Sequence, residues 1–175
     1  MIRKAQGFGL IDVVFVCGIV GLLASIALPK FALARASAGA ASAVGTMRVI
    51  NSSELTFALT CGAGFYAPNL TTLGTAPVGS REAFIQQDLG ASDAVVKSGY
   101  TIQIAATAFG GAPPSCNGLA GGEAGQGFRA AADPADPRNA RFFATNANST
   151  IFEHTSSLFA TMPEVGEPPV GQPLR

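Results

Sequence analysis

Charged side chains are scarce in this chain of 175 residues. Lysine, arginine, aspartate and glutamate together make up 13% of it, and eleven basic residues balance eleven acidic ones. No basic stripe runs along the sequence, so nothing in it points to a nucleic-acid partner. Forty-eight per cent of the residues are hydrophobic. This composition favours a protein that resides outside the cytoplasm.

Residues that carry catalysis or bind metals are also few. The one histidine, His154, lies on an expected strand, where a solvated role suits it better than that of a catalytic base. No Cys-x-x-Cys or Cys/His spacing indicates a metal site. Asp133, Asp136 and Asn139 have oxygen ligands at short spacing, as calcium requires, but Asp-Pro turns explain them better. The glycine-rich stretch 121–127 lacks the Lys-Ser/Thr ending of a phosphate loop. The sequence therefore predicts no enzyme, no cofactor and no metal.

A long apolar run near the N-terminus contains a single acid. Residues 8–28 form a stretch of 21 residues, which as a helix would span roughly 31 Å, close to the apolar thickness of a bilayer. Asp12 interrupts it, although a carboxylate within a bilayer costs roughly 2.5–3.5 kcal/mol. Arg3 and Lys4 precede the run and predict a cytoplasmic N-terminus. An acid in such a place is a candidate functional residue.

Two simpler interpretations of this run remain open. It is a plain membrane anchor, or it is a secretory signal peptide cut after Ala34, since residues 32–34 imitate a small-x-small cleavage site. The second interpretation would leave a soluble exported protein. The apolar core is longer than the 7–15 residues of a usual signal peptide, and Asp12 stands where a signal peptide favours leucine. Both points count against it.

The stretch Gly7-Phe8-Gly9-Leu10-Ile11-Asp12, with the apolar run and Pro29, resembles the N-terminus of type IV pilins and type II secretion pseudopilins. The resemblance implies cleavage between Gly7 and Phe8 and N-methylation of Phe8. It also makes Asp12 the fifth mature residue, whose carboxylate pairs with the α-amino group of Phe8 in a neighbouring subunit during assembly. The family acid is nearly always glutamate, and aspartate keeps the charge with a shorter reach.

The same resemblance implies the partners and the location. The chain would meet a prepilin peptidase/methylase and an inner-membrane assembly platform, and would join other copies of itself in a helical fibre. Before assembly its head would lie in the periplasm, and afterwards in a surface fibre or a periplasmic pseudopilus. A pilus subunit is favoured, because no acidic calcium cluster is visible near the C-terminus. A secretion pseudopilin and a minor tip pilin, with an adhesive or DNA-uptake role, remain the alternatives.

The three cysteines fall into two groups. Cys17 lies in the apolar run and is expected to pack as a small hydrophobic residue. Cys61 and Cys116 lie in the outward part, where an oxidising compartment permits a disulfide. By analogy with the disulfides in many pilin heads, we expect this pair to be bonded. Two free thiols are the alternative.

The pattern of apolar residues predicts one helix from about residue 8 to about residue 60. Pro29 should kink or loosen it, because proline removes one backbone hydrogen bond. Gly39 and Gly45 each weaken the helix by about 1 kcal/mol relative to alanine and allow bending or close helix contact. The helix should end at Cys61-Gly62, where glycine provides a stop signal.

The remaining residues predict a small antiparallel sheet, so the fold class is α+β, with the outer half of the helix packed on the sheet in a pilin-like lollipop. The expected parts are a leader (1–7), a transmembrane or fibre-core segment (8–29), a head with the outer helix (30–162) and a disordered tail (163–175). Within the head we expect short helices near residues 69–74 and 91–96, and another that begins at residues 80–82. We also expect strands at 100–104 and 128–132, a loop at 110–127, and a hairpin of 141–145 with 150–154.

Overall fold

The computed structural model describes residues 9–174, which divide into two compact units. The first unit ends at Ala38, and the second, which we call the head, begins at Gly39. Helix α1 (Leu10–Thr60) contributes to both. Gly39 and Ala40 are the first residues of α1 that are buried. The boundary expected at residue 29 marks the end of a membrane or fibre-core segment and stays a prediction.

In the head, α1 packs one face on the core. From Ala40 to Phe57 its buried apolar residues recur every three to seven positions, as one stripe of a helix requires; with Ala58 they are Ala40, Ala43, Met47, Ile50 and Phe57. The helix ends at Thr60, where it was expected to end. The N–H groups of Cys61 and Gly62 both donate to the carbonyl of Phe57, at 2.9 and 2.7 Å, which closes the last turn.

The sheet of the head has six antiparallel strands, hydrogen-bonded in sequence order. This arrangement confirms the α+β class. A single short helix, α2 (Leu70–Leu73), lies between α1 and the sheet in sequence, and Asn69 caps it by accepting from the N–H of Thr72 at 2.9 Å. The strands are β1 (Ala94–Lys97), β2 (Tyr100–Ala105), β3 (Arg129–Pro134), β4 (Phe142–Asn146), β5 (Ile151–His154) and β6 (Gln172–Pro173).

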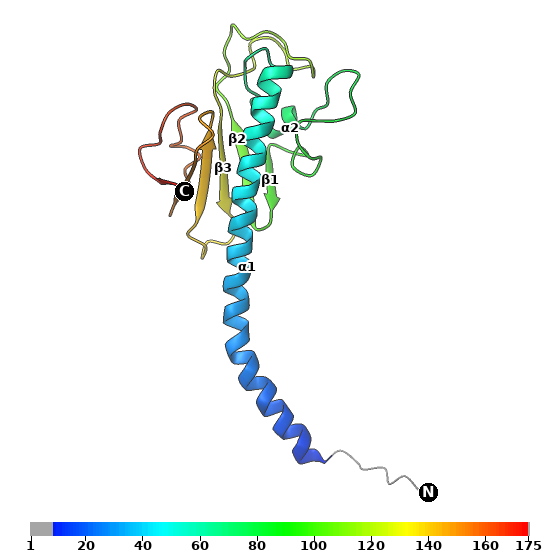
Figure 1. Ribbon diagram of the computed structural model, residues 1–175, viewed down its shortest axis with the longest axis vertical. Coiled ribbons are helices and arrows are strands. Elements are labelled where there is room, and N and C mark those ends of the chain that lie inside the picture. The colour runs from blue at the N-terminus through cyan, green and yellow to red at the C-terminus, as the bar shows by residue number, and fades with distance from the viewer. Residues whose placement is uncertain (1–8, 175) are drawn as a thin grey trace, which may run out of the picture. The chain divides into compact units, whose positions relative to one another are not determined.

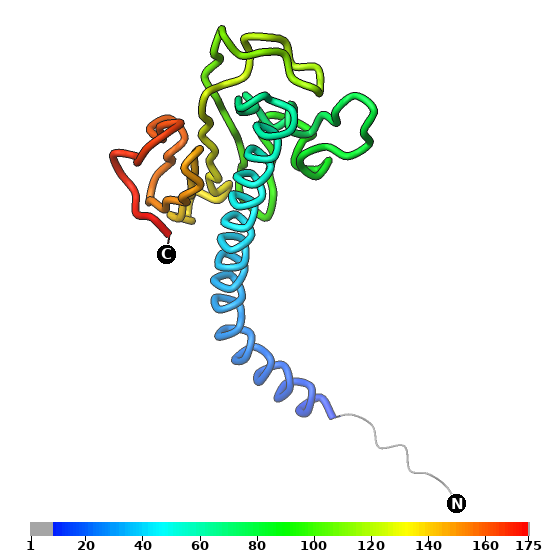
Figure 2. The backbone as a smooth tube through the Cα atoms, turned by 45° about the horizontal axis from the view of Figure 1, so that its top comes forward, coloured from blue at the N-terminus to red at the C-terminus, as the bar shows by residue number. Residues whose placement is uncertain are grey.

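Both faces of the sheet are covered (Figure 1). One face presents Tyr100, Ile102 and Phe143 to α1, in the main core. On the other face, Leu158 and Met162 of the C-terminal segment pack over the central strands. Figure 2 shows this segment, in orange and red, running beside the last strands. The head is therefore a layered structure of helix, sheet and C-terminal segment.

The prediction of a helix near residues 91–96 is wrong, because Ala94–Lys97 form strand β1. Its two valines, Val95 and Val96, are β-branched and favour a strand. Ser98 and Gly99 follow with positive φ angles of 52° and 82°, as the primed two-residue turns of hairpins require. Lys97 and Tyr100 therefore pair across the turn, and β1 becomes an edge strand on β2.

The helix expected to begin at residues 80–82 is also absent. The N–H of Glu82 donates to the hydroxyl of Ser80 at 3.1 Å, and the N–H of Ser80 donates to the carbonyl of Pro77 at 2.9 Å. Such local bonds offer the backbone an alternative to a helix. The other expected elements are present within one or two residues of their predicted bounds.

The C-terminal residues are ordered, which corrects the expectation of a disordered tail from residue 163. The buried amide of Asn146 donates to the carbonyls of Pro163 and Gly166, at 2.9 and 2.6 Å. Further along, β6 pairs with β5. The segment that precedes these residues packs Leu158 and Met162 on the sheet. The burial of those side chains offsets the entropy cost of ordering the C-terminal residues. Arg175 lies outside the described residues.

Candidate functional site

The first unit consists of a helical segment whose apolar side chains are exposed. Every large hydrophobic residue between Leu10 and Leu33 has between 42% and 83% of its surface exposed. Among the described helices, α1 is long and apolar enough to cross a membrane by length and composition. Exposed apolar surface of this extent marks a site that contacts lipid or another protein. The segment is consistent with membrane anchoring.

Asp12 lies in the first turn of α1, where a carboxylate stabilises the positive end of the helix dipole. Its Oδ2 accepts from the N–H of Gly9 at 3.2 Å. The carbonyl of Gly9 in turn accepts from the N–H groups of Asp12 and Val13, at 3.1 and 3.4 Å. The carboxylate therefore contacts Gly9, the first described residue, and Asp12 is the fifth residue after the expected cleavage point.

The expected cleavage and methylation positions, Gly7 and Phe8, lie outside the described residues. The proposed ion pair between Asp12 and the amino group of another copy's Phe8 therefore stays a prediction. The helix is continuous through Pro29. Proline has no N–H to donate to the carbonyl four residues earlier, that of Ser25, so one bond of the helical ladder is missing there.

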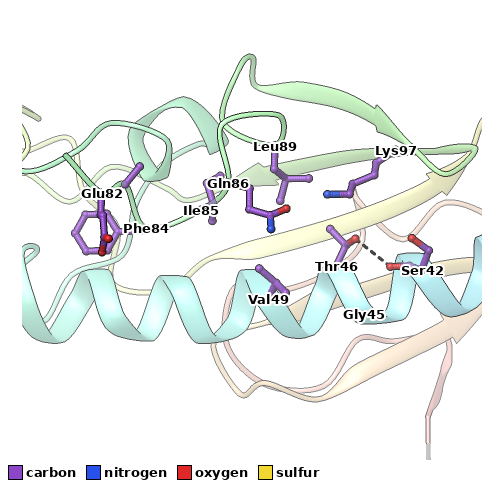
Figure 3. Close-up of a pocket in the computed structure, with 11 residues that line it drawn as sticks. Ser42, Gly45, Thr46, Val49, Glu82, Phe84, Ile85, Gln86, Leu89 and Lys97 are labelled. Atoms are coloured by element: carbon purple, nitrogen blue, oxygen red, sulfur yellow. Dashed lines mark hydrogen bonds between the residues drawn. The ribbon is translucent and has the colours of Figure 1, made fainter.

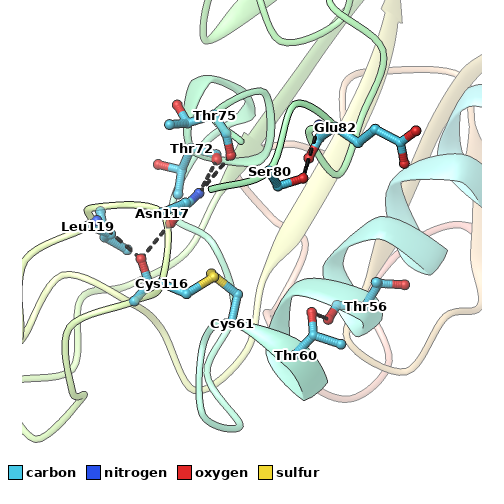
Figure 4. The surroundings of a disulfide bond; sticks show 11 residues. Thr56, Thr60, Cys61, Thr72, Thr75, Ser80, Glu82, Cys116, Asn117 and Leu119 are labelled. Atoms are coloured by element: carbon cyan, nitrogen blue, oxygen red, sulfur yellow. Dashed lines mark hydrogen bonds between the residues drawn. A yellow bond between two sulfur atoms is a disulfide. The ribbon is translucent and has the colours of Figure 1, made fainter. Parts of the chain in front are cut away.

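Cys61 and Cys116 form a disulfide, as the resemblance implied, with their Cα atoms 4.9 Å apart. It joins the end of α1 to the long loop before β3 (Figure 4). Beside it, the N–H of Cys116 donates to the carbonyl of Cys61 at 3.2 Å. The amide of Asn117 donates to the carbonyls of Thr72 and Thr75, at 2.7 and 3.1 Å. These contacts join the end of α1, the residues around α2 and the loop before β3. Cys17 is free and exposed.

A groove of about 690 Å³ lies in the head between α1 and the segment that follows α2 (Figure 3). Its floor is part of α1, and its other wall is residues 82–89, with Lys97 of β1 at one end. The lining residues are Ser42, Gly45, Thr46, Val49, Glu82, Ala83, Phe84, Ile85, Gln86, Leu89 and Lys97. The sequence analysis did not find this groove. The one signal for it was Gly45, a glycine within a helix.

The core of the head contains one ionisable residue that the sequence analysis missed. Glu54, on α1, is 0% exposed, and its Oε2 accepts from the N–H of Ala67 at 2.9 Å. Burial raises the pKa of this carboxyl to about 8, although the hydrogen bond from Ala67 opposes the rise. Charged residues are almost never fully buried without a partner. A glutamate at a core position of the helical stripe was the available signal.

The residues considered for catalysis or calcium do not form one site. Asp133 accepts from the hydroxyl of Ser157 at 2.6 Å. Asp136 instead holds the guanidinium of Arg138 at 2.8 Å. Asn139 donates to the hydroxyl of Tyr100, and His154 bonds the hydroxyl of Ser156. Within residues 9–174, no three His, Cys, Asp or Glu side chains are grouped so that they could hold a metal ion.

The candidate functional sites are therefore the exposed apolar segment, with Asp12 near its start, and the groove on the head. Both are surfaces suited to contact. Comparisons with protein-family models, with curated proteins and with solved structures find no match to this chain.

Proposed function

We propose that this chain is a structural subunit of a type IV pilus or a pilus-like fibre. In this proposal it is inserted in the inner membrane through residues 8–29, processed after Gly7, methylated at Phe8 and assembled through its N-terminal helix. A prepilin peptidase/methylase and an inner-membrane assembly platform are its partners before assembly. A pseudopilin of a secretion system would use the same steps and differs in where the fibre ends.

One observation carries the proposal: the apolar segment is bare, and it begins with an acid. A run of exposed apolar side chains from Leu10 to Leu33 must lie in lipid or among other helices. A plain anchor would gain from replacing Asp12 by an apolar residue, since the carboxylate costs free energy in lipid. A segment that also leaves the membrane and packs among protein helices can use the carboxylate to pair with a positive group.

The chemistry of assembly follows from this arrangement. Cleavage after Gly7 would create a positive α-amino group on Phe8, at the same end of the helix as Asp12. In the low dielectric of a helix bundle, an acid and an amine from two copies attract strongly when their geometry is good. Each incoming copy would then be placed in register by this pair, while burial of apolar side chains supplies most of the cohesion.

Substitution of Asp12 tests the proposal. The Asp12→Ala variant is expected to insert and to be cleaved normally, but to give at least about tenfold less fibre, because a buried amine left without its acid costs about 3–5 kcal/mol. Asp12→Glu is the matched control and should assemble at least as well as the unmodified chain. The measurement is the amount of subunit in the sheared surface fraction relative to the membrane fraction. Normal fibre yield from Asp12→Ala would refute the role of the acid.

A further inference from the structure

The groove on the head has a mainly apolar wall and a floor of small residues (Figure 3). Phe84, Ile85 and Leu89 form the apolar part of the wall, which also includes Glu82 and Gln86. Lys97, the one basic residue of the lining, is already paired with Asp88 at 2.9 Å. The groove therefore offers a mainly apolar surface, with Glu82 as its acidic residue and its one lysine already paired.

The floor of the groove is one face of α1. Ser42 and Val49 each lie three or four residues from Gly45 and Thr46, which places the four residues on the same side of a helix. Three of the four are small, so the backbone of α1 is open to close approach there. Val49 remains 47% exposed in the described structure. The small side chains of this floor suit the close approach of another helix.

Gly45 has no explanation within the head. A Cβ added to Gly45 would meet nothing within 4 Å, and its backbone is ordinary helix. Glycine is the least favourable residue in a helix interior after proline. Gly39 differs, because a Cβ there would lie 2.8 Å from the carbonyl oxygen of Ser98. The head itself requires Gly39, whereas the space above Gly45 is empty.

The chain carries a helix that needs such a surface. All large apolar side chains of its segment 10–33 are exposed. A Cβ added to Gly18 or Gly21 in that segment would also meet nothing within 4 Å. Two helices with glycines at their contact pack closely, because their backbones approach without intervening side chains. Asp12 is the one charged residue between Leu10 and Pro29, so the segment is apolar like most of the groove wall.

We propose that the groove lined by Gly45, Val49 and residues 82–89 receives the apolar helical segment, residues 10–28, of a second copy of this chain. The inference rests on the proposed function, because the segment becomes available to the groove when it leaves the membrane. It adds a specific contact, in which the head of one copy covers the helix of another and Gly45 is the point of closest approach.

Photocrosslinking in assembled fibres tests this contact. p-Benzoylphenylalanine is placed at Val49 in full-length chains, and fibres are grown from mixed isotopically light and heavy copies. The crosslinked peptides are then identified by mass spectrometry. The expected product joins position 49 to a peptide within residues 10–28 of a different copy. The matched control places the probe at Leu55, which is 51% exposed on the same helix but does not line the groove, and this product should be absent.

Filling the groove gives a second measurement. Gly45→Leu adds a side chain into the space above α1, so the variant should keep its melting temperature or raise it, but should lose the crosslink from position 49. Fibres that form with crosslinks from position 49 only to head residues would overturn the groove contact and leave the proposed function standing. A failure of the unmodified chain to form fibres would overturn both. A crosslink that persists in Gly45→Leu would likewise refute the groove.

Discussion

Glu54 is a carboxyl group enclosed in the head, and it makes the stability of the head depend on pH. Its pKa in the folded chain is raised by burial to about 8, from an ordinary value of 4.5. The folded state therefore holds this proton more tightly than the unfolded state does. Stability from this group is complete below pH 4.5 and falls as the pH rises toward 8, because the unfolded chain gains by ionising first.

Glu54→Gln is expected to remove this pH dependence. The amide keeps an oxygen that can accept from the N–H of Ala67, but it does not ionise. At pH 7 the variant should be more stable than the unmodified chain by roughly 3 kcal/mol at most, since one pKa unit corresponds to about 1.4 kcal/mol. The measurement is denaturant unfolding of the full chain in detergent at pH 5, 7 and 8.5.

The matched control is Glu123→Gln. Glu123 also accepts a backbone N–H, that of Ala120, at 3.2 Å, but it is exposed. Its substitution should leave the slope of stability against pH unchanged. Equal pH slopes for the unmodified chain and Glu54→Gln would contradict the raised pKa.

Replacing the two glycines of α1 in the head by alanine is expected to change stability in opposite directions. Gly39→Ala places a Cβ 2.8 Å from the carbonyl oxygen of Ser98, so the turn after β1 must move, at a cost of about 1–3 kcal/mol. Gly45→Ala meets no atom and should stabilise the helix by up to about 1 kcal/mol. Thermal unfolding of both variants checks this. A loss of stability in Gly45→Ala would show that the head needs this glycine.

At the scale of the elements, the sequence predicted what depends on local patterns. The long helix, its end before Gly62 and the hairpin of β4 and β5 follow from apolar spacing and turn residues. The first strand was missed, because Ala91 to Val96 contains alanines that suit a helix, and its strand state depends on pairing with β2. The order of the last residues was missed for the same reason: the amide of Asn146 that holds them lies in another part of the sequence.

The functional candidates divide in the same way. Asp12 and the two bonded cysteines belong to recognisable sequence patterns, so they could be named in advance. The groove could not, because it arises where Phe84, Ile85 and Leu89 fold back over α1, about forty residues later in the chain. Glu54 could have been noticed on the buried stripe of the helix, but its partner Ala67 lies beyond the end of that helix.

The disulfide makes a prediction about the end of α1. Replacing both Cys61 and Cys116 by serine should destabilise the head by about 4 kcal/mol on the chain-entropy model, because the loop that the bond closes is long. Cys17→Ser, which removes a free and exposed thiol, is the control and should leave unfolding unchanged. Thermal unfolding with and without reductant measures both. A double variant as stable as the unmodified chain would show that the hydrogen bonds around Cys116 suffice.

At the scale of the whole molecule, the chain combines a folded head with a helical segment that has no folded partner of its own. The head has an apolar core on both faces of its sheet. The segment from Leu10 to Leu33 exposes its apolar side chains. The proposed function gives that segment two successive environments, the membrane and then other copies, and the proposed groove gives part of it a site on a neighbouring head.

The mass of the mature N-terminus tests the central claim most directly. The protein is purified from the membrane and from sheared surface material of its native host, and its N-terminal peptide is analysed by mass spectrometry. The account predicts that the chain begins at Phe8 and carries one methyl group on its α-amino nitrogen. A chain that begins at Arg35 would contradict the account, since residues 1–34 would then be a signal peptide and the released protein would have no assembly helix.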